Sequence, residues 1–493
     1  MEMNDLCRYL LYSLSTVVIL IGNAGTRSRF SVGLLKISGY LMLLSLNLII
    51  GYGFFQSILL LTSILVSLIV SLYTAGYSSE KYGSNSLQLL VDGLTISIIA
   101  TLSSKYLLEF VMFWLMSEII GFLAIAYNTL VGIDTRAMNA SLKYLIFSMI
   151  PTDIALFLIL AVSNFENILT ITLLELNLDL ASPALTITAL LGFMAKAAIV
   201  PLHFWLPDAH SMAPAPISAL LSGIMVKMGI YGFVILSHFA IDAGTAFSIL
   251  FVFGSLAAVY GALQAIYQRD IKRLLAYSTI SNTGVIAILI AFYIKSADPT
   301  FIYAALTFSV AHALYKATLF IDSGVIELLT HERNIDSLGY IYRVAPIESL
   351  SAILSILFIF GMPPAIGFLA KVLIFSALLH YIAKDWIYLF TIIIISIETS
   401  LTILYSAKYL LAHIRIHKNV NTLGTINLKA LGLSPYVLLL TMTSIALTPI
   451  VLLVRGSTPL PIEIDIIILY IITFPLLLFI LLALYTVFKQ SRV

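Results

Sequence analysis

Four lysines lie inside strongly apolar stretches of the sequence, where a buried cation is unfavourable. They are Lys196, Lys227, Lys316 and Lys371. A charged side chain at the centre of a membrane helix costs roughly 2.5 to 3.5 kcal/mol on translocon-based scales. Ionisable residues in such positions are typical of ion and proton pathways. The four lysines therefore predict a route for protons through a membrane.

Acidic and imidazole side chains occur in the same apolar stretches and are suited to exchange protons with the lysines. The group comprises Glu118, Asp153, His312, Asp322 and Glu398. Burial disfavours a charged lysine, whereas a neighbouring carboxylate favours it, so a moving or neutralised carboxylate changes the affinity of the lysine for its proton. The two groups together predict a chain of proton-exchanging side chains.

The composition determines the class of protein before any motif is considered. Of the 493 residues, 61% are hydrophobic and only 10% are charged, and the mean hydropathy is +1.06. A soluble globular domain usually has about 25% charged residues. The chain is therefore expected to be an all-α polytopic membrane protein. Because Cys7 is the only cysteine, a multi-cysteine metal or iron–sulfur site is excluded, and we expect no cofactor or metal in this chain.

Apolar runs of about 20 residues between polar breaks predict about 14–15 transmembrane helices. The expected ranges are 9–24, 31–50, 54–76, 86–106, 108–127, 139–163, 184–206, 214–240, 245–267, 272–294, 300–329, 346–380, 385–412, 434–455 and 464–488.

The loop charges predict the orientation of these helices. With the N-terminus outside, seventeen Lys and Arg residues, Lys36 among them, fall on the inner side, and five, Arg8 among them, fall on the outer side. Positive charge is enriched on the cytoplasmic side of membrane proteins. We therefore expect a multi-pass protein of the inner or plasma membrane with its N-terminus outside.

Prolines interrupt two of the predicted helices close to a buried lysine. Pro201 follows Lys196, and Pro363 and Pro364 precede Lys371, each within about two helical turns. Proline removes a backbone donor and clashes with the preceding turn, so both helices should kink or unwind. Unwound backbone at membrane depth is tolerated where protein encloses it or where it lines a watery cavity.

A pair of interrupted helices in corresponding positions of two halves is typical of inverted-repeat transporters. We therefore predict two inverted five-helix repeats, each with one broken helix. The expected segments are 1–85 with helices 1–3, 86–240 with helices 4–8, 245–412 with helices 9–13 and 413–493 with helices 14–15.

Five motifs, in this order along the chain, resemble those of one family of membrane subunits. They occupy 196–210, 213–232, 268–281, 312–320 and 363–371. In these stretches the sequence resembles the antiporter-like subunits of respiratory complex I. The same family includes subunits of membrane-bound hydrogenases and of Mrp-type sodium/proton antiporters. The resemblance extends over about residues 54 to 411.

The resemblance implies roles for individual residues. It implies that Glu118 pairs with Lys196. Lys227, His312 and Lys371 are then further proton-binding residues of the path, in the order in which the family carries them along its chain. A proton is then expected to enter from the inner side near Lys196 and Lys227, to move laterally through His312, and to leave outward by Lys371.

Some of these residues also have structural interpretations. Glu118 and Lys196 could form an ion pair that only locks two helices. Lys316 lies on the same helical face as His312, yet its long side chain could instead reach an interface. Asp322 and Glu398 depart from the family pattern. Together with Asp153 they are expected to be either additional acid sites or part of a cation site. The identity of the transported ion therefore stays open.

These observations favour a proton-translocating subunit of a redox-driven complex, of the complex I or membrane-bound hydrogenase type. The subunit itself would carry out no redox chemistry. The alternatives are a subunit of an Mrp-type sodium/proton antiporter and a membrane subunit for inorganic-carbon uptake. Expected partners are paralogous antiporter-like subunits, small membrane subunits, the lipid bilayer, protons and Na+, but no nucleic acid.

Overall fold

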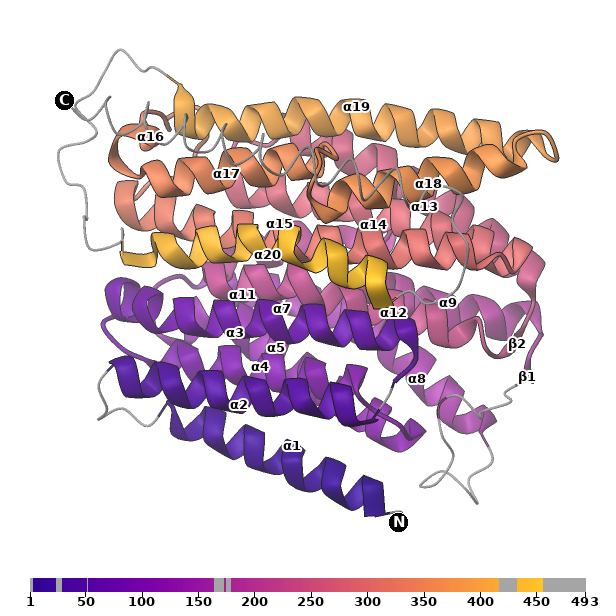
Figure 1. Ribbon diagram of the computed structural model, residues 1–493, viewed down its shortest axis with the longest axis horizontal. Coiled ribbons are helices and arrows are strands. Elements are labelled where there is room, and N and C mark those ends of the chain that lie inside the picture. Colours follow the sequence, from indigo (N-terminus) through magenta and orange to yellow (C-terminus); the bar gives the residue numbers. More distant parts are fainter. Residues whose placement is uncertain are drawn as a thin grey trace. The chain divides into compact units, whose positions relative to one another are not determined.

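The computed structural model describes residues 3–23, 29–50, 52–163, 173, 179–415 and 432–454. These residues are mostly helical (Figure 1). Within them, eight helices are long and apolar enough to cross a membrane, and seven shorter helices are also apolar. This confirms the prediction of an all-α polytopic membrane protein. The helix predicted at 464–488 lies outside the described residues.

The chain divides into two compact units, Met1–Phe253 and Gly254–Val493. Each unit contains one of the two proline-interrupted helices. The inverted relation between the two five-helix repeats, and the four segment boundaries given above, remain predictions.

Five helices packed in chain order open the first unit, and each contacts the next (Figure 1). They are α1 (Met3–Ile21), α2 (Arg29–Ile50), α3 (Phe54–Tyr82), α4 (Ser86–Leu102) and α5 (Leu107–Ile125). The short α6 (Tyr127–Leu130) follows.

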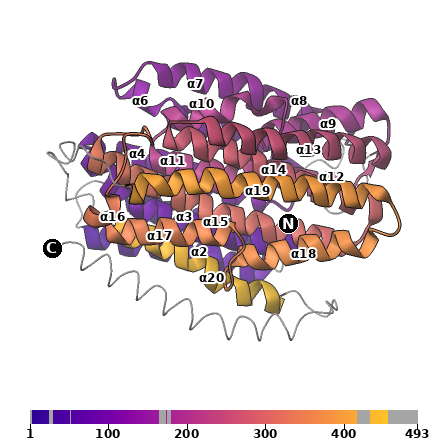
Figure 2. The same cartoon turned by 90° about the horizontal axis from the view of Figure 1, so that it is seen from above.

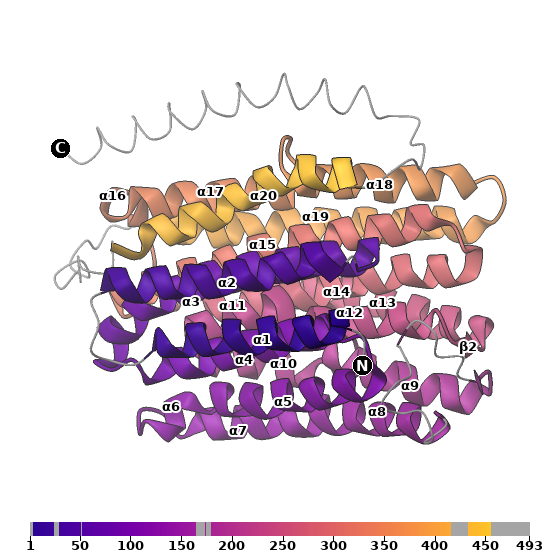
Figure 3. The ribbon, with the colours of Figure 1, turned by 60° about the horizontal axis from the view of Figure 1, so that its bottom comes forward.

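The rest of the first unit contains two helices with π-helical stretches. One consists of α7 (Arg136–Tyr144), η1 (Leu145–Met149) and α8 (Ile150–Val162), which follow one another without a break (Figure 3). The other consists of α11 (Ala215–Leu220), η4 (Leu221–Met225) and α12 (Val226–Leu236). Between them lie α9 (Pro183–Lys196), the 3-10 turn η3 (Leu202–Phe204) and α10 (Trp205–Met212).

A pair of two-residue strands is an addition to the all-helical expectation. β1 (Asp179–Leu180) pairs in parallel with β2 (Ala240–Ile241). The pair joins the segment before α9 to the segment after α12. It leaves the helical class of the fold unchanged.

The second unit is built around the long helix α15 (Pro299–Thr330), which contacts α14, α17, α18 and α20. α17 and α18 lie alongside α19, one after the other (Figure 2). The helices are α13 (Ala243–Tyr267), which contains the boundary between the units, α14 (Ile271–Ser296), α16 (Ile341–Val344), α17 (Pro346–Ile359), α18 (Ile366–Tyr381), α19 (Trp386–Ile414) and α20 (Ser434–Val454).

Aspartate caps define where three of these helices begin. Asp270 accepts hydrogen bonds from two backbone N–H groups at the start of α14, and Asp298 and Asp385 each accept one at the starts of α15 and α19. An N-cap aspartate satisfies donors that the first helical turn leaves unpaired. Pro299 follows Asp298 at the first helical position, where its missing N–H has no cost.

Both proline-containing stretches interrupt a helix. α9 ends at Lys196, and helical structure resumes only with η3 at Leu202, after Pro201. α17 ends at Ile359 and α18 begins at Ile366, with Pro363 and Pro364 in the gap. The buried lysine precedes the interruption in the first unit, whereas Lys371 follows it in the second.

Close backbone packing holds the first interruption against α12. A Cβ atom added to Gly229 would lie 2.6 Å from both the Phe193 carbonyl oxygen and the Ala197 nitrogen. Real Cβ atoms do not approach backbone atoms this closely, so only glycine fits. Gly229 thereby allows α12 to touch the end of α9, where Lys196 is located.

We predict that Gly229→Ala destabilises the protein by about 1 kcal/mol or more, because the added methyl group overpacks this contact. In an unhindered helix the same change would stabilise by about 0.5 to 1 kcal/mol. The unfolding midpoint in detergent measures the effect. Gly53→Ala is the matched control, because a Cβ there meets nothing within 4 Å and φ is −55°. Equal midpoints for the two variants would contradict the packing argument.

Candidate functional site

A buried ion pair joins α5 to the end of α9. Lys196 Nζ lies 3.0 Å from Glu118 Oε1, and both side chains are 0% exposed. Trp114 Nε1 donates a hydrogen bond to the same carboxylate oxygen at 3.1 Å, and Lys196 donates to Tyr144 Oη at 2.9 Å. The amine therefore has two partners, a carboxylate and a phenol.

Lys196 occupies a special place in the backbone. It is the last residue of α9, where the partial negative charge of the helix end favours a cation. Two residues later Ala198 adopts φ = 54°, a left-handed conformation that is strained for a residue with a side chain. Such strain often accumulates at functional sites and hinges.

A second carboxyl group accompanies this ion pair. Asp153 on α8 interacts electrostatically with both Glu118 and Lys196. Glu118 Oε2 and Asp153 Oδ1 are buried without a hydrogen-bond partner among the described residues. Because carboxylates only accept hydrogen bonds, two carboxyl groups can bond to each other only when one is protonated. Two acids and one lysine are electrically neutral when one acid keeps its proton, so the cluster can store a proton.

Lys227, the second buried lysine of this unit, belongs to a helix with irregular hydrogen bonding. Its side chain is 0% exposed, and Nζ donates to the Ser222 carbonyl at 2.7 Å. Ser222 lies in the π-helical stretch η4, which ends two residues before Lys227. Such π-bulges are frequent at functional sites.

The second unit buries Lys316 and His312 on neighbouring turns of α15. Lys316 Nζ donates to the Ser278 hydroxyl and, at 3.2 Å, to the Leu275 carbonyl, both on α14. The His312 ring contacts the Tyr315 ring at 5.6 Å between centroids. Both side chains are 0% exposed, so Lys316 does not extend to an interface within this unit.

Glu398 on α19 is the carboxylate associated with the lysines of this unit. Its Oε1 accepts hydrogen bonds from Ser281 at 3.1 Å and Thr402 at 2.8 Å. It also interacts electrostatically with Lys316 and Lys371. The sequence suggested Glu398 as an additional acid site or as part of a cation site, and in the structure it interacts electrostatically with two of the predicted lysines.

Lys371 differs from the other three lysines in being only partly buried. Its amine donates to the Phe360 carbonyl at 3.0 Å, in the interruption between α17 and α18. It lines a cavity of about 750 Å³ that also reaches Ser376 and His380. Gly361, at φ = 82°, leaves room for the lysine, since a Cβ there would lie 2.9 Å from Lys371 Cδ.

Asp322 on α15 is fully buried in a second cluster. It accepts a hydrogen bond from Tyr409 at 2.5 Å and lies 3.1 Å from His413 Nε2. His413 was not among the site residues predicted from the sequence. His413 directly follows the predicted helix 385–412 that contains Glu398, and α19 extends to include it.

Lys36 forms a buried ion pair that the sorting of loop charges did not anticipate. Lys36 is 0% exposed within α2 and lies 2.7 Å from Asp92 Oδ2 on α4. Ser71 and Asn23 also bond to Asp92, and Ser71 accepts from the Lys36 amine. Sorting cations by loop missed this pair, although both residues lie in apolar runs and meet the criterion applied to the other lysines.

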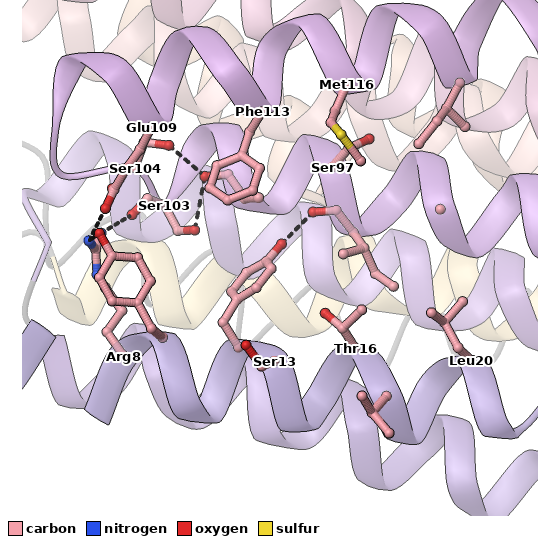
Figure 4. Close-up of a pocket in the computed structure, with 17 residues that line it drawn as sticks. Arg8, Ser13, Thr16, Leu20, Ser97, Ser103, Ser104, Glu109, Phe113 and Met116 are labelled. Atoms are coloured by element: carbon pink, nitrogen blue, oxygen red, sulfur yellow. Dashed lines mark hydrogen bonds and ion pairs between the residues drawn. The ribbon is translucent and has the colours of Figure 1, made fainter. Parts of the chain in front are cut away.

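Arg8 is likewise not a free loop cation. It lies 2.5 Å from Glu109, at one end of a pocket of about 490 Å³ between α1, α4 and α5 (Figure 4). Phe113, Met116 and Leu20 contribute to its mainly apolar lining. None of the predicted site residues lines this pocket.

The described residues contain no grouping of three or more His, Cys, Asp or Glu side chains suited to hold a metal ion. The clusters described above instead combine lysines, carboxyl groups, hydroxyl groups and a histidine. Such groups can accept, hold and pass on protons.

Comparison with known proteins identifies relatives in several membrane complexes. The family model described as "NADH:quinone oxidoreductase/Mrp antiporter, TM" matches residues 104–402. The chain is 30% identical over 330 residues to a Na(+)/H(+) antiporter subunit of Alkalihalophilus pseudofirmus, covering 64% of this chain and 41% of that protein. It is 31% identical over 330 residues to hydrogenase-4 component B of Escherichia coli, covering 63% and 48%.

Two further comparisons extend over more of the chain. NADH-ubiquinone oxidoreductase chain 5 of Myxine glutinosa is 29% identical over 391 residues, covering 77% of this chain and 62% of that protein. The structure of the Mrp complex from Dietzia sp. DQ12-45-1b includes a chain with the same fold, with a TM-score of 0.73 and 22% identity, covering 100% of this chain and 56% of that one. The chain thus spans less than half of the first two relatives and somewhat more than half of the other two.

We predict that Asp92→Leu and Lys36→Met each lower stability by about 3 to 5 kcal/mol, because each leaves the other charge buried without its partner. The double variant should recover most of this loss, since a hydrophobic pair of similar volume has no charge to desolvate. Unfolding midpoints in detergent for the two single variants and the double variant test the prediction. A double variant as unstable as the sum of the single variants would contradict it.

Proposed function

The chain belongs to the NADH:quinone oxidoreductase/Mrp antiporter transmembrane family, and on this premise we propose that it is a proton-translocating, antiporter-like subunit of a redox-driven membrane complex. The complex would be of the complex I or membrane-bound hydrogenase type. The subunit would hold no redox cofactor, and its contribution would be to bind and release protons within the membrane.

The observation that carries the proposal is the pair formed by Glu118 and Lys196. Their charged atoms are 3.0 Å apart and both side chains are fully buried. A purely structural lock would need only these two groups. The adjacent Asp153 adds a second carboxyl group to a site with one lysine, and this excess acid gives the site a proton to exchange.

The energies involved are of suitable size for gating. Moving one charge across a membrane potential of 100 mV requires about 2.3 kcal/mol. Breaking a buried ion pair by removing one partner typically costs about 3 to 5 kcal/mol. A displacement that separates Lys196 from Glu118 can therefore control whether the lysine keeps its proton. Tyr144, at 2.9 Å from the amine, offers a second hydrogen-bond partner during such a displacement.

The other predicted residues form the remaining stations of the proposed path. In the first unit the proton moves between Lys196 and Lys227. In the second unit it moves through His312 and Lys316 to Glu398 and Lys371. The order of Lys196, Lys227, His312 and Lys371 is the order that the family resemblance implies, and Lys316 and Glu398 are additions to it.

Lys371 is the proposed point of release. It is the least buried of the four lysines, and it faces a cavity that contains Ser376 and His380. A lysine next to an open cavity can exchange its proton with water, whereas the enclosed lysines must pass theirs to neighbouring side chains. We propose release on the outer side of the inner or plasma membrane, with the N-terminus also outside.

The energy source is proposed to be a redox reaction in partner subunits. Relatives of this chain are named as subunits of NADH oxidoreductases, hydrogenase-4 and Na(+)/H(+) antiporters. We propose that this chain likewise assembles with paralogous antiporter-like subunits and small membrane subunits. The polypeptides that copurify with it would identify the type of complex.

A sodium/proton antiporter subunit is the second candidate function. It is favoured by the similarity to the Na(+)/H(+) antiporter protein of Alkalihalophilus pseudofirmus, which at 30% identity is close to the 31% found with hydrogenase-4 component B. In that case a sodium gradient rather than a redox reaction would drive the proton.

We predict that Glu118→Gln and Lys196→Met abolish proton transport by the reconstituted complex while its subunits still copurify. Each change removes a group that must bind or modulate a proton. Glu109→Gln is the matched control, an acid on the same helix that pairs with Arg8 outside the proposed path. Transport is measured as acidification of vesicles with a pH-sensitive dye.

Full transport by both variants would end the proposed assignment. Loss of transport in the Glu109→Gln control as well would show that any change of charge on α5 is disruptive.

We predict that redox-driven proton transport by the wild-type complex continues when choline replaces sodium on both sides of the membrane, because the proposed path carries protons alone. Vesicle acidification with and without sodium provides the measurement. Transport that stops without sodium and is driven by an imposed sodium gradient would establish the antiporter alternative.

A further inference from the structure

A polar stripe runs along one face of α19. Its members are spaced by four, three, four and four residues, which keeps them on the same side of a helix. None is more than 4% exposed. The stripe extends for about 22 Å, given a rise of 1.5 Å per residue. Its members are Glu398, Thr402, Tyr405, Tyr409 and His413.

The stripe contacts polar groups of α14 and α15 along its length. At one end Glu398 accepts hydrogen bonds from Ser281 and Thr402. In the middle Thr402 lies 3.2 Å from the Tyr405 hydroxyl, and the Lys316 amine lies 6.0 Å from the centre of the Tyr405 ring. The stripe thus connects with the centre of the proposed path at Glu398 and Lys316.

At its other end the stripe reaches Asp322 and His413. His413 Nε2 lies 3.1 Å from Asp322 Oδ2, and Nδ1 lies 3.1 Å from the Ser349 hydroxyl. A hydroxyl can donate to Nδ1 or accept from it, so this arrangement suits the neutral ring and the imidazolium equally. The ring can therefore gain or lose a proton without moving its neighbours.

The hydrogen bonds of Tyr409 allow Asp322 to change its charge as well. The single hydroxyl proton of Tyr409 faces two oxygens, Asp322 Oδ2 at 2.5 Å and the Leu319 carbonyl at 3.0 Å. When Asp322 is ionised, Tyr409 donates to it. When Asp322 is protonated, the acid donates to Tyr409, which then donates to the Leu319 carbonyl.

Glu348 on α17 supplies a second buried acid. One of its oxygens accepts a hydrogen bond from Ser434, and it interacts electrostatically with Asp322. Glu348 Oε2 and Asp322 Oδ1 are both buried without a hydrogen-bond partner in the described part of the chain. Buried carboxylate oxygens that lack donors strongly disfavour ionisation of both acids at once.

The charges around this cluster require protons within it. With both acids ionised and the His413 ring neutral, the charge of Asp322, Glu348 and His413 is −2. The three groups are electrically neutral only when they hold two further protons. The nearby helices provide charged groups with partners of their own. Lys272 on α14 pairs with Glu327 on α15 at 3.2 Å, and Arg343 on α16 bonds to Tyr342. The described residues of α20 contain no charged side chain.

We propose that Asp322, Glu348 and His413 form a proton-loading site, and that the polar stripe of α19 carries protons between this site and Glu398 and Lys316. The inference rests on the proposed function and adds a route to it, one that enters the second unit directly at the end of α19. From the loop charges this end is expected on the inner side. The ligand is a proton and no metal is required.

The transfer step is balanced in protons. His413 accepts a proton at Nδ1 and becomes an imidazolium, and Ser349 turns from donor to acceptor. The imidazolium passes its Nε2 proton to Asp322 Oδ2 and becomes the neutral Nδ1–H tautomer. Asp322 then donates to Tyr409, as its geometry permits. Ionised Asp322 is restored when Glu398, at the far end of the stripe, takes up the proton and becomes protonated. A flip of the neutral His413 ring, which exchanges Nδ1 and Nε2, then readies the ring for the next proton.

Infrared spectroscopy of the intact complex in membranes tests the loading site without requiring transport. A protonated carboxyl group gives a carbonyl stretch, absent from carboxylates, that shifts on deuterium exchange. We expect this band in the wild type and its reduction in Asp322→Asn or Glu348→Gln. Ser400→Ala, an exposed position on α19, should leave it unchanged. A band unaffected by either acid substitution would overturn the loading site.

Proton transport by the reconstituted complex tests the route. Asp322→Asn, His413→Gln and Tyr409→Phe should each lower the rate at least about tenfold, as removal of a proton-transfer group does elsewhere. Tyr409→Phe keeps the ring and removes only the hydroxyl, so it tests the route even if one of the other two variants misfolds. Wild-type rates in all three, with the infrared band intact, would overturn the route.

The two experiments separate this inference from the proposed function. If the wild-type complex moves no protons at all, the proposed function fails, and the infrared band still decides whether the site holds a proton. If Glu118→Gln and Lys196→Met stop transport but the three route variants do not, the proposed function stands and the route along α19 is wrong.

Discussion

Charge buried away from water is the constraint that organises this structure. An isolated ion in an apolar interior costs many kcal/mol, so it persists only with a partner or with a proton that neutralises it. Lys196 with Glu118, Lys36 with Asp92, and His413 with Asp322 are three solutions of this kind, all fully buried. They differ in how many acids each lysine or histidine must balance, and on this difference we base the proposed distinction between structural and proton-transferring pairs.

Lys36 and Asp92 form a cluster in which the donors and the charges match. Asn23, Ser71 and Lys36 all donate to one carboxylate, so neither charge gains from changing. The clusters around Glu118 and Asp322 instead contain an extra carboxyl group and buried oxygens without donors among the described residues. Their neutral states include a stored proton, and storing a proton is what a path for protons requires.

Irregular backbone accompanies three of the four lysines of the proposed path. Lys196 ends α9 before the proline interruption, Lys227 follows a π-helical stretch, and the Lys371 amine bonds to a carbonyl in the second interruption. In regular helices the backbone carbonyl groups already accept hydrogen bonds from within the helix. Interruptions free carbonyl groups and make space, which explains why these lysines lie beside them.

The sequence by itself determined the helical membrane class, the interrupted helices and most of the buried ionisable residues, because apolar runs, prolines and charges are local properties of the chain. It did not predict that Lys36 pairs with Asp92 or that His413 meets Asp322. Apart from Glu118 with Lys196, which the family resemblance paired, the contacts between charged groups were decided by the tertiary structure. Asp153 joins Glu118, and Glu348 joins Asp322, from helices whose separation along the chain carries no information on distance. Pairing depends on packing in three dimensions, which brings together residues from distant parts of the chain.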